Sequence, residues 1–237
     1  MTPELGQIAL ILALLLSLTQ GVLPLIGAWR GNTALMAVAR PAAAGQAVFV
    51  WLAFGLLAWS LLSLDFSVRY VADNANIALP WYYRIAAVWG AHEGSLLLWI
   101  AILSTWTVLL AACSRHLPQH FAARVLAVLG LVSVGFLAFI LLTSNPFGRL
   151  SPIPLDGREL NPVLQDPGMT FHPPVLYTGY VGFSVAFAFA VAALLGGELE
   201  QAWVRWARPW TNVAWACLTA GIVAGSWWAY AELGWGG

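Results

Sequence analysis

Hydrophobic residues run along this chain in about six long stretches, separated by segments that contain arginine or acidic residues. Each stretch is close to the roughly 20 residues that an α-helix needs to cross a hydrocarbon core of about 30 Å. The stretches do not alternate strictly between apolar and polar positions, and in lipid a helix satisfies its own backbone hydrogen bonds. The predicted spans are about 5–26, 43–64, 92–113, 122–143, 174–196 and 209–232. The pattern therefore predicts an all-α fold, a polytopic integral membrane helix bundle formed by residues 1–237 as a single membrane domain.

Composition supports a membrane protein. Hydrophobic residues make up 61 % of the chain and charged residues 8 %, which is too few charges to cover a soluble globule of 237 residues. The formal net charge is zero, so electrostatics give no reason to expect a nucleic-acid partner.

The connections between the spans fall into two groups that predict the orientation in the membrane. The segments 27–42, 114–121 and 197–208 are short and, with Arg124 just inside the next span, account for six arginines, whereas 65–91 and 144–173 are longer and contain four. Arginine-rich short loops favour the cytoplasmic side. We therefore expect outer loops 65–91 and 144–173 and both termini on the outer face, which in a bacterium is the periplasmic side of the inner membrane.

The segment Phe171-His172-Pro173-Pro174 is the first candidate for chemistry. Proline is tolerated in a first helical turn, so His172 is expected at the rigid beginning of the span 174–196. Two interpretations are open. The imidazole hydrogen-bonds a loop carbonyl at a helix boundary, or it is presented outward as an axial ligand of haem iron.

Two further segments combine polar or aromatic residues with glycine. His92 and Glu93 lie between Gly90 and Gly94 at the predicted start of a span. They are either part of a solvated helix end or ionisable groups with a functional role. The tail from Gly225 to Gly237 is rich in tryptophan, which is typical of a membrane interface. Glycine beside an indole also exposes its face, which suits stacking on a planar ligand.

Several of these fragments occur in an order that resembles one family. They are 81–90 (WYYRIAAVWG), 92–95 (HEGS), 143–147 (TSNPF), 160–167 (LNPVLQDP), 171–174 (FHPP), 225–230 (GSWWAY) and 232–237 (ELGWGG). Together they resemble the haem lyase subunit of bacterial system I cytochrome c maturation, the CcmF type, within the haem-handling superfamily.

The resemblance implies a function in cytochrome c-type biogenesis. In that family, haem arrives on a periplasmic haem chaperone, is held on the outer face, and is attached covalently to the CxxCH motif of apocytochrome c. The resemblance assigns His172 as an axial ligand of haem iron, and a haem-binding surface that includes Trp228, Trp235, Gly236 and Gly237.

The resemblance also implies that the chain is the N-terminal part of a longer protein. The family's second loop histidine and the rest of its tryptophan-rich segment would lie beyond Gly237. We therefore expect a part of a haem lyase complex, which works with other maturation subunits and the C-terminal portion, and which supplies no catalytic side chain that the sequence identifies.

Two other classes of protein are compatible with the residues. One is a membrane transporter or respiratory-complex subunit with a polar path near His92 and Glu93. The other is a structural partner that holds other maturation subunits together, in which His172 and Trp235 would be dispensable.

Overall fold

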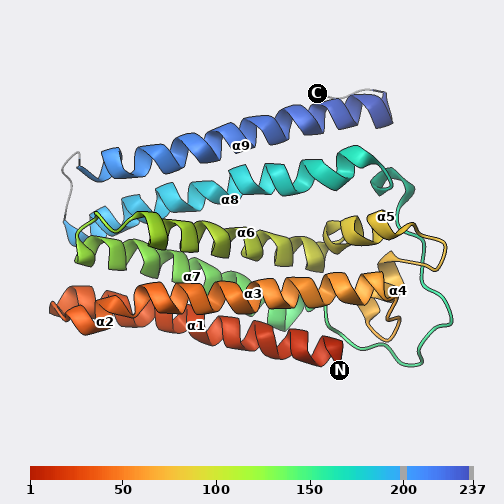
Figure 1. Cartoon of the computed structure of the whole chain (residues 1–237), viewed down its shortest axis with the longest axis horizontal. Coiled ribbons are helices and arrows are strands. Elements are labelled where there is room, and N and C mark those ends of the chain that lie inside the picture. The colour runs from red at the N-terminus through yellow and green to blue at the C-terminus, as the bar shows by residue number, and fades with distance from the viewer. Residues whose placement is uncertain (198–201, 235–237) are drawn as a thin grey trace.

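Six long helices run side by side in the computed structural model, which describes residues 1–197 and 202–234 (Figure 1). All six are long and apolar enough to cross a membrane. They are α1 (Thr2–Arg30), α3 (Ala39–Leu62), α6 (His92–Cys113), α7 (Gln119–Thr143), α8 (Pro167–Gly196) and α9 (Ala202–Leu233). The shorter helices are α2 (Thr33–Ala37), α4 (Arg69–Asn74), α5 (Trp81–Ala86), η1 (Ala87–Trp89) and η2 (Pro162–Leu164). The predicted fold class, an all-α membrane bundle with six spans, is confirmed.

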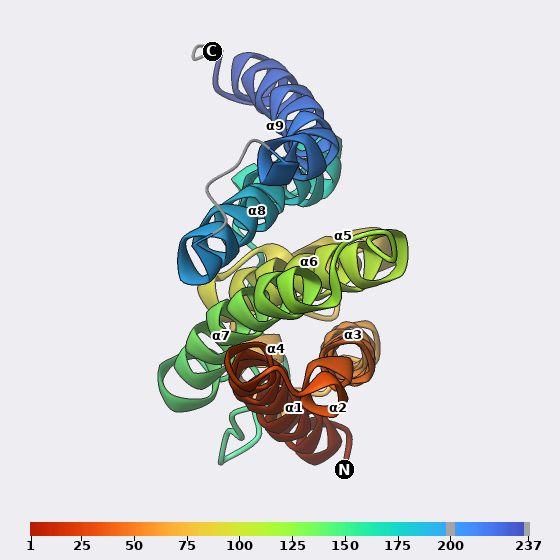
Figure 2. The same cartoon turned by 90° about the vertical axis from the view of Figure 1, so that its left-hand side faces the viewer.

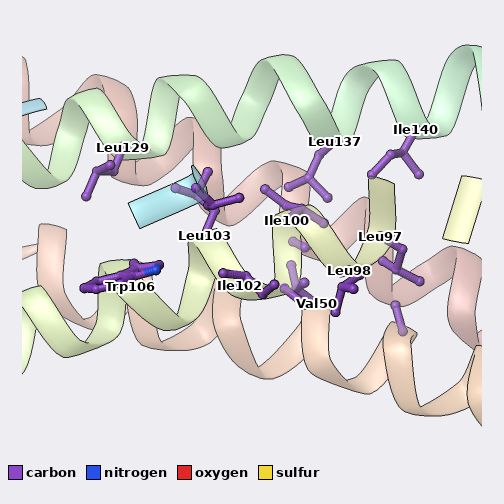
Figure 3. Packing of buried hydrophobic residues seen from close by; sticks show 14 of the residues in the cluster. Val50, Leu97, Leu98, Ile100, Ile102, Leu103, Trp106, Leu129, Leu137 and Ile140 are labelled. Carbon is purple, nitrogen blue, oxygen red and sulfur yellow. The ribbon is translucent and has the colours of Figure 1, made fainter. Parts of the chain in front are cut away.

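The long helices are arranged in three layers. Viewed along the bundle, α1 and α3 form one side, α6 and α7 lie in the middle, and α8 and α9 form the other side (Figure 2). The middle layer holds much of the core, where aliphatic side chains of α6 pack between those of α7 and Val50 of α3 (Figure 3). The helices α4 and α5 gather at one end, together with the start of α1 and the end of α9 (Figure 1). The short connections lie at the opposite end.

The predicted start of the fifth span is wrong by seven residues. Helix α8 begins at Pro167, because the side chain of Asp166 accepts a hydrogen bond from the N–H of Gly168 at 2.6 Å and proline suits the first helical position. Pro173 therefore lies in the second turn and not at the helix boundary, and the loop before α8 ends at residue 166. The other helices differ from their predicted bounds mainly by extending further at their ends, with α9 beginning at Ala202 instead of 209.

Glycines bring α8 and α9 into close contact along their length. The spacing Gly221–Gly225 on α9 is the small-residue pattern that lets two helices approach in lipid, where packing and hydrogen bonds must hold helices together. A Cβ atom on any of these glycines would collide with the opposite helix. The facing pairs, in order along the contact, are Gly168–Trp228, His172–Gly225, Leu176–Gly221, Gly179–Leu218 and Gly182–Ala214.

Replacing Gly179 should separate the two helices. In Gly179→Ala the new methyl group would meet the backbone of Leu218, so we expect a loss of about 1–3 kcal/mol in stability. Thermal unfolding in detergent measures the effect. Gly135→Ala is the matched control, since a Cβ there meets nothing within 4 Å. Equal unfolding temperatures for the two variants would contradict the close packing.

Candidate functional site

The segments 65–91 and 144–166 fold into one structure at the end of the bundle that carries α4 and α5. Backbone hydrogen bonds join them, from Arg69 N–H to Gly148 O at 2.8 Å and from Arg158 N–H to Ala72 O at 2.7 Å. The carboxylate of Asp156 accepts from the N–H of Ile77 at 3.0 Å. The long loop before α8 is therefore held by hydrogen bonds to segment 65–91, although it has no regular period of its own.

Tyr70 anchors the turn that leads into α6. Its buried hydroxyl lies 2.9 Å from the carbonyl oxygens of Ala87 and of Val88, and it accepts a hydrogen bond from the N–H of Ala91 at 3.2 Å. Burial raises the pKa of Tyr70, so the hydroxyl remains a donor. Gly94 leaves the room that this arrangement needs, because a Cβ there would collide with the Tyr70 hydroxyl and with Val88 O.

Arg84 stabilises the same segment, 65–91, by hydrogen bonds to backbone carbonyl groups. Its guanidinium donates hydrogen bonds to three backbone carbonyl groups, those of Leu79 at 2.8 Å, Ile77 at 3.1 Å and Leu62 at 3.3 Å. A planar guanidinium with several fixed donors suits such a bridge better than an ammonium group would. The motif around Arg84 therefore has a structural role in shaping the loop-bearing end of the bundle.

His172 lies half-buried in the second turn of α8, against α9. Its Nδ1 atom is 2.9 Å from the carbonyl oxygen of Gly221. A carbonyl oxygen can only accept, so Nδ1 carries the hydrogen and donates. Gly225 makes the contact possible, because a side chain there would occupy the position of the imidazole ring.

This hydrogen bond determines the chemistry of the other ring nitrogen. With the hydrogen on Nδ1, the neutral imidazole has a lone pair on Nε2, which is the form that binds a metal. Nε2 has no hydrogen-bond partner among the described residues. The two interpretations of His172, a hydrogen bond to a carbonyl group and a metal ligand, are therefore compatible, because they concern different nitrogens of the same ring. The carbonyl belongs to helix α9 and not to a loop.

Trp228 lies beside His172, as the sequence predicts for residues of a common surface. The two rings are stacked, with centroids 6.3 Å apart and an angle of 12° between their planes. The indole Nε1–H of Trp228 is buried and finds no acceptor in the described part of the chain. Unpaired buried donors are unusual in native proteins and mark places where an acceptor is expected.

The remaining predicted residues are not part of this pair. Trp235, Gly236 and Gly237 lie outside the described residues. His92 is exposed at the start of α6, where its Nε2 is 3.0 Å from the hydroxyl of Ser144, and its ring meets Phe139.

Trp89 is a site residue whose partner the sequence analysis did not identify. Pro173 has no N–H to donate to the carbonyl of Met169 one turn earlier, and the indole Nε1–H of Trp89 donates to that carbonyl at 3.2 Å. The signals were an Asp-Pro-Gly helix start at Asp166 and a proline seven residues later, at position 173. Together they identify a helix whose first turns have a free carbonyl.

Fold and site together define a class of protein, a polytopic membrane bundle that presents a histidine and a stacked tryptophan at its loop-bearing end. Comparison with known proteins gives the family. The family model described as "Cytochrome C assembly protein" matches residues 89–237, more than half of the chain. The chain belongs to this family, whose members take part in cytochrome c-type biogenesis.

Relatives extend the match over the whole chain. The cytochrome c-type biogenesis protein CcmF of Pseudomonas aeruginosa is 65 % identical over 238 residues, which cover 100 % of this chain and 36 % of the relative. CcmF of Escherichia coli is 55 % identical over 245 residues, with 100 % and 37 % covered. The solved structure "Cytochrome c Heme Lyase CcmF" matches with a TM-score of 0.88 and 36 % identity, covering 100 % of this chain and 38 % of that one. The chain thus spans a little over a third of the length of these proteins.

Removing the Tyr70 hydroxyl should loosen the outer surface. Tyr70→Phe removes the hydrogen-bond partner of the Ala91 N–H and the hydroxyl next to the Val88 carbonyl, and we expect a cost of about 1–3 kcal/mol. Hydrogen exchange of residues 65–91 should become faster. Tyr82→Phe, at an exposed ring, is the control. Unchanged exchange in Tyr70→Phe would contradict the anchoring role.

The tautomer of His172 can be measured directly. Nitrogen NMR of histidine-labelled protein should find the hydrogen of His172 on Nδ1. Gly225→Ala should displace the ring and abolish this preference, whereas Gly55→Ala, where a Cβ meets nothing within 4 Å, should preserve it. Finding the hydrogen on Nε2 of the unmodified protein would refute the assignment.

Proposed function

We propose that this chain provides the haem-binding part of a cytochrome c haem lyase complex, with His172 as an axial ligand of the haem iron. The hydrogen bond of 2.9 Å from Nδ1 of His172 to Gly221 carries the proposal. It orients the ring and makes the other nitrogen a lone-pair donor, which is how proteins prepare histidine for a metal. One histidine suffices for an axial bond to haem iron, since the porphyrin itself supplies the in-plane ligands.

The aromatic residues next to His172 fit a large planar substrate. Trp228 is stacked parallel to the imidazole, and its unpaired Nε1–H offers a hydrogen bond to a polar group. We assign Trp235, Gly236 and Gly237 to the same surface on the strength of the family resemblance. In this proposal the indoles contact the haem face and the glycines let it approach closely.

The proposed reaction places limited demands on protein side chains. When a cysteine thiol adds to a haem vinyl group, a carbon–sulfur bond forms and the thiol hydrogen moves to the neighbouring carbon, so the addition consumes no net electrons. Both thiols belong to the CxxCH motif of apocytochrome c. The contribution of this chain is then to bind haem and to hold it in a fixed orientation, which by itself can accelerate a reaction strongly.

The orientation in the membrane follows the distribution of charge. Six of the ten arginines belong to the short-connection end of the bundle, whereas eight of the ten acidic residues belong to the end with α4 and α5. We infer that the short connections face the cytoplasm and that both ends of the chain face the periplasm across the inner membrane. A periplasmic haem chaperone, apocytochrome c, the other maturation subunits and the C-terminal portion would then meet at the surface around His172.

No observation favours the transporter hypothesis. A polar path would need ionisable groups near the middle of the spans, but the Asp, Glu, His and Arg residues of the described long helices lie within the first two turns or the last turn. His92 and Glu93 belong to the first turn of α6.

Replacing His172 with glutamine tests iron ligation separately from the hydrogen bond to Gly221. In His172→Gln the side-chain amide can still donate to Gly221 O, but it does not replace imidazole as an iron ligand. We expect the protein, produced with the other maturation subunits of its source organism, to retain its fold and to lose haem by at least about tenfold, equivalent to ~1.4 kcal/mol of binding. Pyridine haemochrome spectra and cytochrome c yield measure the loss.

The control is His92→Gln, which changes a histidine at the same end of the bundle. Its haem content should remain near that of the unmodified protein. Full haem content and cytochrome c yield in both His172→Gln and His172→Ala would overturn the ligand assignment.

A further inference from the structure

A cavity lies at the opposite end of the bundle from His172. It has a volume of about 520 Å³ and is formed by the beginning of α3 and the connection between α6 and α7. Figure 1 places this end, with α2, away from α4 and α5. The cavity therefore takes no part in the site described above. Its walls include Met36, Arg40, Arg115, Leu117, Gln119 and Leu126.

The polar side of this cavity is cationic. Arg40 donates a hydrogen bond to the carbonyl of Ser114 at 3.3 Å, which holds its guanidinium at the cavity, and Arg115 lines the same space. Across the described ranges, neither arginine has a carboxylate within ion-pair distance. The sequence explains this, because segments 5–64 and 94–155 contain no Asp or Glu. Two arginines thus line one cavity, and the described residues of its walls include no acidic side chain.

A buried hydroxyl lies close to this cavity but does not open into it. The Oγ atom of Ser114 is buried and has no hydrogen-bond partner within the described part of the chain, and the residue as a whole is 3 % exposed. Ser114 lines a small neighbouring space that shares Arg40 and Leu126 with the cavity walls and is too narrow for a water molecule. The donors that line the cavity itself are therefore the guanidinium groups of Arg40 and Arg115, and the Ser114 hydroxyl is not counted among them.

We propose that this cavity binds the phosphate of an anionic phospholipid, with phosphatidylglycerol as the ligand. Guanidinium groups match the geometry of phosphate oxygens, and basic pockets between transmembrane helices are suited to anionic headgroups. The remaining walls, including Met36, Leu117 and Leu126, are apolar and suit an acyl chain. The position at the helix ends is where a headgroup lies, and a volume of about 520 Å³ is within the range of small-ligand sites. The inference is independent of the proposed function at His172.

The test measures lipid binding to the full chain. Native mass spectrometry in mild detergent, with phosphatidylglycerol or phosphatidylcholine added, counts the lipids that remain bound. We expect one phosphatidylglycerol to be retained at least about tenfold more strongly than phosphatidylcholine and to raise the unfolding temperature. The double variant Arg40→Gln/Arg115→Gln should lose this preference. Arg40→Lys with Arg115→Lys should keep part of it, because the charges remain while the bidentate geometry is lost.

Arg205→Gln is the matched control, since it removes one positive charge from the same end of the bundle but outside the cavity. Its preference for phosphatidylglycerol should equal that of the unmodified protein. Equal losses in Arg205→Gln and in the double variant would show a general charge effect and overturn the site. Inorganic phosphate that competes at the same concentration as the lipid would also overturn the proposal, since it would make the ligand free phosphate. Circular dichroism of each variant checks that the bundle is intact.

Discussion

The close approach of α8 and α9 is the constraint on which the candidate site depends. Inside a membrane, burial of apolar surface does not drive helices together, so their contact must come from packing and hydrogen bonds. Glycines on both helices remove the side chains that would separate them. As a result, the carbonyl of Gly221 comes within 2.9 Å of the His172 ring. A feature that serves helix packing thereby determines which imidazole nitrogen can bind a metal.

Much of the fold could be predicted because the governing signals are long and repetitive. Six apolar runs define six spans in lipid, and the six long helices confirm them. The ends of the helices were harder to predict, because they depend on single residues. Asp166 starts α8 earlier than hydrophobicity suggests, and the prolines at 173 and 174 are tolerated inside the helix. Hydropathy detects a span, whereas a capping residue determines where its first turn begins.

The sequence singled out candidate residues for the site, but it did not predict their geometry. His172 and Trp228 could be singled out from their motifs, and the structure brings the two rings together. The acceptor at Gly221 and the donor at Trp89 could not be predicted, since both contacts join segments that are remote in sequence. Such contacts depend on how α8 sits against its neighbours, which a local pattern does not contain. The roles of His172, Trp228, Trp235, Gly236 and Gly237 in haem binding remain predictions.

The proline at 173 has a consequence for how the outer surface is held to α8. In an ordinary helix the N–H of residue 173 would compete with any outside donor for the carbonyl of Met169. Proline removes this competitor, so the carbonyl accepts from Trp89 without opposition from its own helix. The carbonyl of Met169 thus exchanges a donor in its own helix for the indole of Trp89. Helix α8 lacks one internal backbone hydrogen bond at this turn. In its place, a hydrogen bond joins the segment that ends at Trp89 to α8, three residues before His172.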